Sequence, residues 1–130
     1  KVMVVEDNAE LRQFICEILS GTYRVVGVAD GVMALEKIEE EIPDFIITDI
    51  MMPRMNGWDA ARTIRAMNRP DAEIIPIIAM SANAFSEDIM DSRLAGMDIH
   101  LAKPLDEAKM INALKQCIAE RSAVKLRNDL

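Results

Sequence analysis

Five side chains able to do chemistry stand where short apolar runs of this sequence end. Three carry carboxylates, one a hydroxyl and one an ammonium: Glu6, Asp7, Asp49, Ser81 and Lys103. Short continuous apolar runs are typical of strands buried on both faces, so these side chains are predicted at the carboxyl ends of strands. In an open parallel sheet those ends share one edge, and ligand sites form just outside it. We therefore expect the five side chains to converge.

Such a cluster predicts a cation site. Three carboxylates close together would raise one another's pKa values, and a divalent cation relieves that repulsion. Oxygen ligands favour a hard ion, and a few carboxylates completed by water and phosphate oxygens favour Mg²⁺ over a Ca²⁺ cage. Taken singly, each acid could equally cap a helix, Ser81 could be a turn residue, and Lys103 could be a solvated surface charge. Their joint placement at different strand ends favours a site.

The rest of the chain alternates strands with helices. Strands are predicted over residues 1–5, 23–29, 44–48, 74–80 and 97–101, and helices over about 9–20, 32–40, 60–67, 85–94 and from 106 onward. This order predicts right-handed crossovers and an α/β fold, in which helices cover both faces of one parallel sheet. Gly57 is expected to permit a backbone turn, and Gly96 to end the fourth helix. Arg62 and Arg65 are expected to point outward.

Composition limits the function classes. The 130 residues suit one domain with one core, and the 51% hydrophobic content supplies that core. The net charge of −7 argues against direct nucleic-acid binding, which needs a basic surface. No apolar run approaches about 20 residues, so insertion into a membrane is not expected. Cys16 and Cys117 are expected to be free, buried thiols rather than a disulfide.

Four motifs carry a resemblance to a known family. They are VEDN at 5–8, DIMMPRMNG at 49–57, MSA at 80–82 and KP at 103–104. Together they resemble the receiver domain of two-component response regulators, from residue 2 to about residue 119. The resemblance implies a flavodoxin-like (βα)5 fold with strand order 2-1-3-4-5. It implies a receiver domain over residues 1–120, followed by a polar extension of the last helix or a tail over 121–130.

The resemblance also implies roles around a Mg²⁺ ion. Asp49 would be the phosphoacceptor, taking a phosphoryl group from a phosphohistidine. Asp7 would bind Mg²⁺ directly, Glu6 would bind it through water, and the backbone carbonyl of Met51 would complete the protein ligands.

Further roles follow for the phosphoryl group itself. Lys103 would pair with it, and the Ser81 hydroxyl would bond to it once it is on the protein. His100 occupies a switch position where receivers usually carry an aromatic ring, and it would move when Ser81 moves. The face that changes would consist of the fourth helix, fifth strand and fifth helix. The alternative interpretation is that His100 is merely a partly exposed strand residue.

Two stretches, 80–85 and 96–106, are similar to the receivers of hybrid sensor histidine kinases. Expected partners are therefore a histidine kinase dimerisation and phosphoacceptor domain or a histidine phosphotransfer domain, with a homodimer left open. The isolated domain would be no enzyme beyond its own phosphorylation and dephosphorylation. Because the chain opens on Lys1, we expect a processed protein or a piece of a longer one, in the cytoplasm, either free or tethered to a membrane-bound kinase.

Three other functions compete with this interpretation. A phosphatase with an aspartate nucleophile resembles this fold but carries a second Asp two residues later, where this chain has Met51. A phosphate-independent interaction module usually lacks part of the acidic site, which is complete here. A flavin-binding domain needs hydroxyls and backbone donors after the first strand, where this chain has Glu6 and Asp7.

Overall fold

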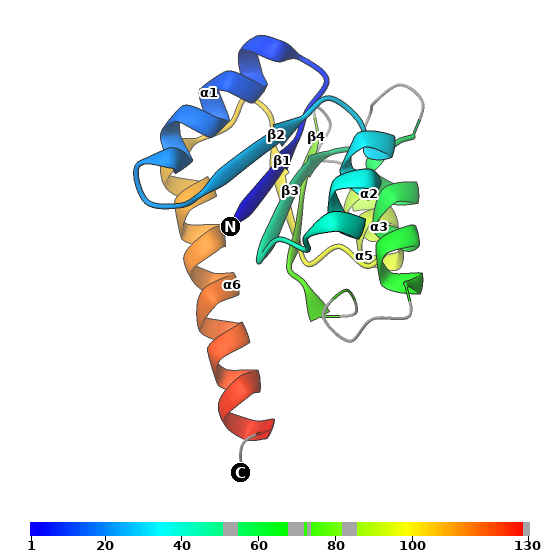
Figure 1. Cartoon of the computed structure of the whole chain (residues 1–130), viewed down its shortest axis with the longest axis vertical. Helices are drawn as coiled ribbons and strands as arrows, with labels where there is room; N and C mark the ends of the chain where they lie inside the picture. Colours follow the sequence, from blue (N-terminus) through cyan, green and yellow to red (C-terminus); the bar gives the residue numbers. More distant parts are fainter. Residues whose placement is uncertain (51–54, 68–71, 73, 82–85, 129–130) are drawn as a thin grey trace.

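One parallel sheet forms the centre of the computed structural model, with its strands in the order β2-β1-β3-β4-β5 (Figure 1). The structure describes residues 1–50, 55–67, 72, 74–81 and 86–128, without the side chains of 86–88 and 121–128. The strands are β1 (Val2–Val5), β2 (Val25–Val28), β3 (Phe45–Asp49), β4 (Ile77–Ser81) and β5 (Ile99–Ala102). The predicted α/β fold and strand order are confirmed.

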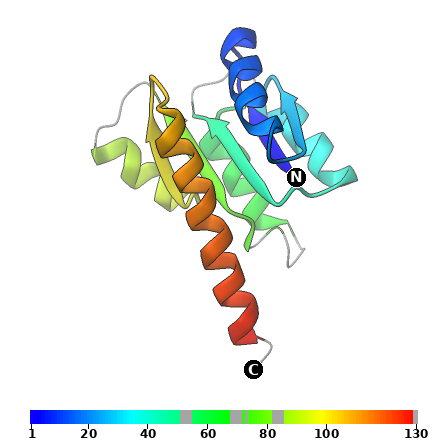
Figure 2. The same cartoon turned by 90° about the vertical axis from the view of Figure 1, so that its left-hand side faces the viewer.

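Helices cover both faces of this sheet (Figures 1 and 2). The helices are α1 (Ala9–Ser20), α2 (Gly31–Glu40), α3 (Gly57–Ala66), α5 (Ser86–Leu94) and α6 (Glu107–Asn128). Helices α1 and α6 pack on one face, and α2, α3 and α5 lie on the other. Alternate residues of β1 therefore enter different cores: Val2 and Val4 pack toward α1 and α6, while Met3 and Val5 pack on the opposite side.

The parallel register aligns the strand ends at one edge. Val5 lies level with Val28 and Thr48, so Glu6 and Asp49 are the next residues beyond that level on neighbouring strands. Side-chain caps then start the helices close to these ends. The Asn8 Oδ1 atom accepts a hydrogen bond from the Leu11 amide at 3.1 Å. Such a cap satisfies a backbone donor that the first turn leaves unpaired.

Strands β4 and β5 are shifted farthest along the chain from their predicted positions. Strand β4 begins at Ile77, not at residue 74, and Ile74 is exposed. Pro76 has no amide hydrogen to donate, and its carbonyl accepts the Ile46 amide at 3.0 Å just before the strand begins. Strand β5 begins at Ile99 and extends to Ala102, one residue farther than predicted.

The outward position predicted for Arg65 is wrong. Its guanidinium is largely buried and donates from Nε and Nη2 to the Gly96 carbonyl oxygen at 3.0 and 2.8 Å. Nη2 also pairs with Asp98 Oδ2 at 3.0 Å. Gly96 ends α5 as predicted, with a φ of 97°, which an L side chain rarely adopts. Arg65 thus joins α3 to the turn that leads into β5.

Both cysteines are free, as predicted, but Cys16 is only partly buried. Cys117 is buried, and burial raises the pKa of its thiol to about 11, so this thiol stays protonated at neutral pH. None of the helices in the described part of the chain combines the length and the apolar character that crossing a bilayer requires.

Gly57 is required for close packing rather than for a turn. A Cβ there would collide with the Asp49 carbonyl oxygen and lie 3.0 Å from Ile50 Cα. The Gly57 amide also donates to the Ile50 carbonyl at 2.8 Å, which holds the start of α3 against the end of β3. Glycine therefore lets α3 begin directly beside the Asp49 backbone.

We predict that Gly57→Ala lowers the free energy of unfolding by about 1–3 kcal/mol, because the added methyl group has no space against backbone atoms. Gly21→Ala is the matched control, since a Cβ at residue 21 would meet nothing within 4 Å and the φ of Gly21 is −67°. That variant should be neutral or stabilised by up to about 1 kcal/mol. Urea unfolding of the two variants measures both values. Equal stabilities would contradict the packing role of Gly57.

Candidate functional site

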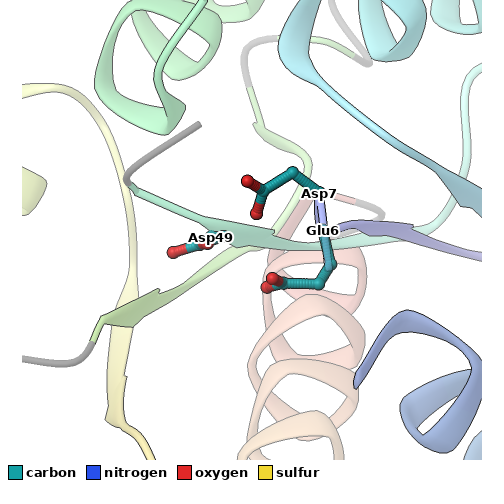
Figure 3. Close-up of side chains that lie close together, drawn as sticks. All are labelled: Glu6, Asp7 and Asp49. Carbon is teal, nitrogen blue, oxygen red and sulfur yellow. The ribbon is translucent and has the colours of Figure 1, made fainter. Parts of the chain in front are cut away.

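Three carboxylates meet at the carboxyl edge of the sheet (Figure 3). Glu6 and Asp7 follow β1 and Asp49 ends β3, and each offers an oxygen within 4.8 Å of the others. Glu6 is 1% exposed and Asp49 5%, whereas Asp7 is exposed to solvent. The structure therefore brings together the three acids that the sequence predicted at one edge.

Lys103 lies between the two buried acids. Its Nζ is 3.1 Å from Glu6 Oε2 and 3.2 Å from Asp49 Oδ2, and its side chain is 21% exposed. The Lys103 amide donates to the Ser81 carbonyl at 2.8 Å, which fixes the start of this side chain beside β4. One ammonium therefore neutralises charge from two strands at once.

The charges of this cluster do not balance. Burial, and next the charge of Asp49, raise the pKa of Glu6, although the bond from Lys103 and the Asn8 amide oppose this. Burial alone would lower the pKa of Lys103, but its bonds and charge attraction to Glu6 and Asp49 raise it overall. Among the described residues, three carboxylates face one ammonium, so a cation held by oxygen ligands would relieve the remaining repulsion.

This donor set fits a hard divalent ion. Carboxylate oxygens are the ligands that Mg²⁺ prefers, and an exposed Asp7 leaves space for water to complete the shell. Met51, whose carbonyl was predicted to be a further ligand, lies outside the described residues. One feature of the surroundings was not predicted: Arg12 donates from Nη1 to the Glu6 carbonyl at 2.8 Å, which ties α1 to the end of β1.

Ser81 and His100 are joined on neighbouring strands. The Ser81 hydroxyl lies 2.8 Å from His100 Nε2, and the buried Ser81 ends β4. In the register of β3 and β4, Asp49 is level with Met80, so Ser81 stands one residue beyond the Asp49 level. The two predicted switch residues are therefore in contact, close to the edge where the acids meet.

Sequence reasoning missed two residues that are linked to His100 by polar contacts. Ser92 Oγ lies 3.4 Å from His100 Nδ1, and the Trp58 Nε1–H donates to the same Ser92 oxygen at 3.0 Å. Their separation along the chain hid this contact, because no spacing rule connects α3, α5 and β5.

Comparison with known proteins decides the family. A model of the response regulator receiver domain matches residues 2–115. The chain belongs to this family. It is therefore a receiver domain of two-component signalling, and its strand order is the one that the solved receiver structures share.

Relatives of this receiver domain occur in different settings. Hybrid signal transduction histidine kinase D of Dictyostelium discoideum is 37% identical over 110 residues, which is 85% of this chain but only 7% of that protein. Chemotaxis protein CheY of Thermotoga maritima is 34% identical over 118 residues, covering 89% of this chain and 95% of CheY.

One similar solved structure contains a metal ion. The receiver domain of sensor histidine kinase PA1611 from Pseudomonas aeruginosa matches with a TM-score of 0.82 and 36% identity, covering 91% of this chain and 96% of that one. That structure holds a magnesium ion coordinated in its active site cleft.

We predict that Lys103→Met lowers the free energy of unfolding at pH 7 in metal-free buffer by about 1–3 kcal/mol, because two buried carboxylates lose their counter-charge. Because the pKa of Glu6 is raised in the fold, the contribution of Glu6 to stability falls as the pH rises above 4.5. The decrease with pH should be steeper in Lys103→Met. The difference in the free energy of unfolding between wild type and variant should therefore become smaller toward pH 4. Urea unfolding at both pH values measures it.

Lys37→Met is the control, since Lys37 is exposed and lies 4.0 Å from the exposed Glu40. Its effect should stay small at both pH values. A deficit of Lys103→Met that does not change with pH would show that the lysine acts through packing instead of charge.

Proposed function

We propose that this receiver domain accepts a phosphoryl group from a phosphohistidine onto Asp49 in a Mg²⁺-dependent reaction, and that phosphorylation switches its partner-binding face. The observation that carries the proposal is the position of Asp49. It is a buried carboxylate at a strand end, 3.2 Å from the Lys103 ammonium and grouped with two further acids.

Asp7 and Asp49 would bind the Mg²⁺, Glu6 would bind it through water, and the Met51 carbonyl would complete the protein ligands. The oxygen-only donor set and the unbalanced charge of the cluster support this assignment. The bound ion would offset negative charge on the phosphoryl oxygens during transfer. The magnesium in the PA1611 receiver domain is consistent with this set of roles.

In the proposed reaction, an Asp49 carboxylate oxygen attacks phosphorus and forms an acyl phosphate. The P–N bond of the phosphohistidine breaks, its electron pair stays on the imidazole nitrogen, and solvent protonates the ring. Lys103 already contacts the Asp49 carboxylate, so its ammonium can pair with the incoming phosphoryl oxygens after a small movement. Little else is required, because phosphoryl transfer depends mainly on positioning and charge neutralisation.

The switch would follow from Ser81. Its hydroxyl would donate to a phosphoryl oxygen and give up its place on His100, so that the His100 ring moves. A gap of a few kcal/mol between two conformations suffices for such a change. The surface affected would be α5, β5 and α6, which adjoin His100.

The setting of the domain forms part of the proposal. Its partners would be a histidine kinase dimerisation and phosphoacceptor domain or a histidine phosphotransfer domain, as in a hybrid sensor kinase. The receiver unit would comprise residues 1–120, with 121–130 as an extension, and would act in the cytoplasm without touching nucleic acid. Beyond its own phosphorylation and dephosphorylation, the isolated domain would catalyse nothing.

We expect one phosphoryl adduct by intact-mass analysis after incubation with acetyl phosphate and Mg²⁺, and none in Asp49→Asn, which lacks the nucleophile. Chelation of the metal should abolish the adduct in the wild type. Asp91→Asn is the control, because Asp91 is an exposed aspartate on α5, and its adduct should match that of the wild type. No adduct from either acetyl phosphate or a phosphorylated histidine phosphotransfer domain would overturn the proposal.

We also expect Asp7→Asn to weaken Mg²⁺ binding by about 10-fold or more, because it removes the exposed carboxylate of the cluster. Calorimetric titration with MgCl₂ measures the affinity, again with Asp91→Asn as the control. Unchanged affinity in Asp7→Asn would remove Asp7 from the ligand set.

A further inference from the structure

A chain of polar contacts leads from Ser81 into the helices on one face of the sheet. Ser81 Oγ lies 2.8 Å from His100 Nε2, and His100 Nδ1 lies 3.4 Å from Ser92 Oγ. The Trp58 indole N–H then donates to Ser92 Oγ at 3.0 Å. Four side chains from β4, β5, α5 and α3 are thereby connected in series.

The chemistry of these groups couples their states. The indole can only donate, so the Ser92 oxygen accepts from Trp58 and its own proton is able to go to His100 Nδ1. The neutral ring then carries its proton on Nε2 and donates to Ser81. In the opposite tautomer Ser81 must donate to Nε2, and its proton is no longer available to a phosphoryl oxygen. The state of the ring therefore decides what Ser81 can offer.

Burial makes the arrangement costly to break. Ser92 is 2% exposed and Ser81 5%, and a buried hydroxyl that loses its partner does not regain it from water. This series of polar contacts can therefore exist in two discrete arrangements, in which the His100 ring is either bonded to Ser81 or released from it. Ser92 contacts the ring from the side opposite Ser81, through the other ring nitrogen, and Trp58 in turn contacts Ser92.

We infer that Ser92 and Trp58 are positioning residues of the phosphorylation switch, which hold the His100 ring on Ser81 and carry the state of Ser81 to α5 and α3. The inference rests on the proposed function of Ser81 as the phosphoryl-binding hydroxyl. It adds a second route for the signal, into α3, beside the α5, β5 and α6 face.

Charged groups near the ring bear on its protonation. His100 lines a cavity of about 320 Å³ together with Arg93 from α5 and Asp98 from the turn before β5. The residue that α6 contributes, Gln116, is neutral, and so are Ser81 from β4 and Trp58 from α3. Among the side chains that the structure describes in this cavity, a protonated ring therefore faces one cation and one anion, and both serine oxygens can accept from it.

The sequence offers two unambiguous probes for this inference, since His100 is the only histidine and Trp58 the only tryptophan. We expect the indole ¹H–¹⁵N signal of Trp58 to shift between pH 5 and 8 with the same midpoint as the imidazole signals of His100. In Ser92→Ala that indole shift should fall several-fold, while His100 still titrates. Ser20→Ala, an exposed serine on α1, is the matched control and should behave as the wild type.

A second measurement follows the switch itself. Beryllofluoride with Mg²⁺, a mimic of the bound phosphoryl group, should move the indole signal in the wild type and move it several-fold less in Ser92→Ala. Intact-mass analysis of the same proteins after acetyl phosphate separates the two claims. The inference is overturned if both proteins form the adduct but the Trp58 indole signal does not follow the titration of His100. It is also overturned if that signal responds equally in Ser92→Ala and wild type. The proposed function stands in either case. Absence of the adduct in the wild type, both with acetyl phosphate and with a phosphorylated histidine phosphotransfer domain, overturns the proposed function instead.

Discussion

The contact of one ammonium with two buried carboxylates is the interaction on which this edge of the sheet depends. Glu6 and Asp49 come from neighbouring strands and would repel each other without Lys103, which lies 97 residues after Glu6 in the sequence. Because the one ammonium that pairs with these acids in the described part of the chain does not balance three carboxylates, the cluster is incomplete as a purely structural ion-pair network. The same imbalance suits a site that takes up a cation and a phosphoryl group in turn.

The fold supplies this arrangement through register and close packing. Parallel pairing brings the ends of β1 and β3 to one level, and the absence of a side chain at Gly57 lets α3 start against the Asp49 backbone. Ser81 ends the next strand, β4, and its hydroxyl lies 2.8 Å from His100 on the strand after that, β5. A charge change at Asp49 would therefore occur beside a pair of polar side chains that connects the sheet to its covering helices.

The fold and the meeting of the charged site residues could be predicted from the sequence. Alternating strands and helices predict a parallel sheet, and in a parallel sheet the carboxyl ends of the strands share one edge. The meeting of Glu6, Asp7, Asp49 and Lys103 followed from that rule alone. The contacts of Arg65 and the link from Trp58 to Ser92 could not be predicted, since each depends on a partner about thirty residues away on another helix or turn. The start of β4 was misplaced because Ile74 and Ile75 read as strand, although only the residues after Pro76 enter the ladder.

The position of the modified residue is the most direct test of the proposed chemistry. Borohydride reduces an aspartyl phosphate to homoserine, so tandem mass spectrometry of the phosphorylated and reduced protein identifies the acceptor. We predict homoserine at residue 49, present only when Mg²⁺ accompanied the donor. Homoserine at residue 7 or at any other aspartate, or none in a protein that carries a phosphoryl group, would contradict the assignment of Asp49.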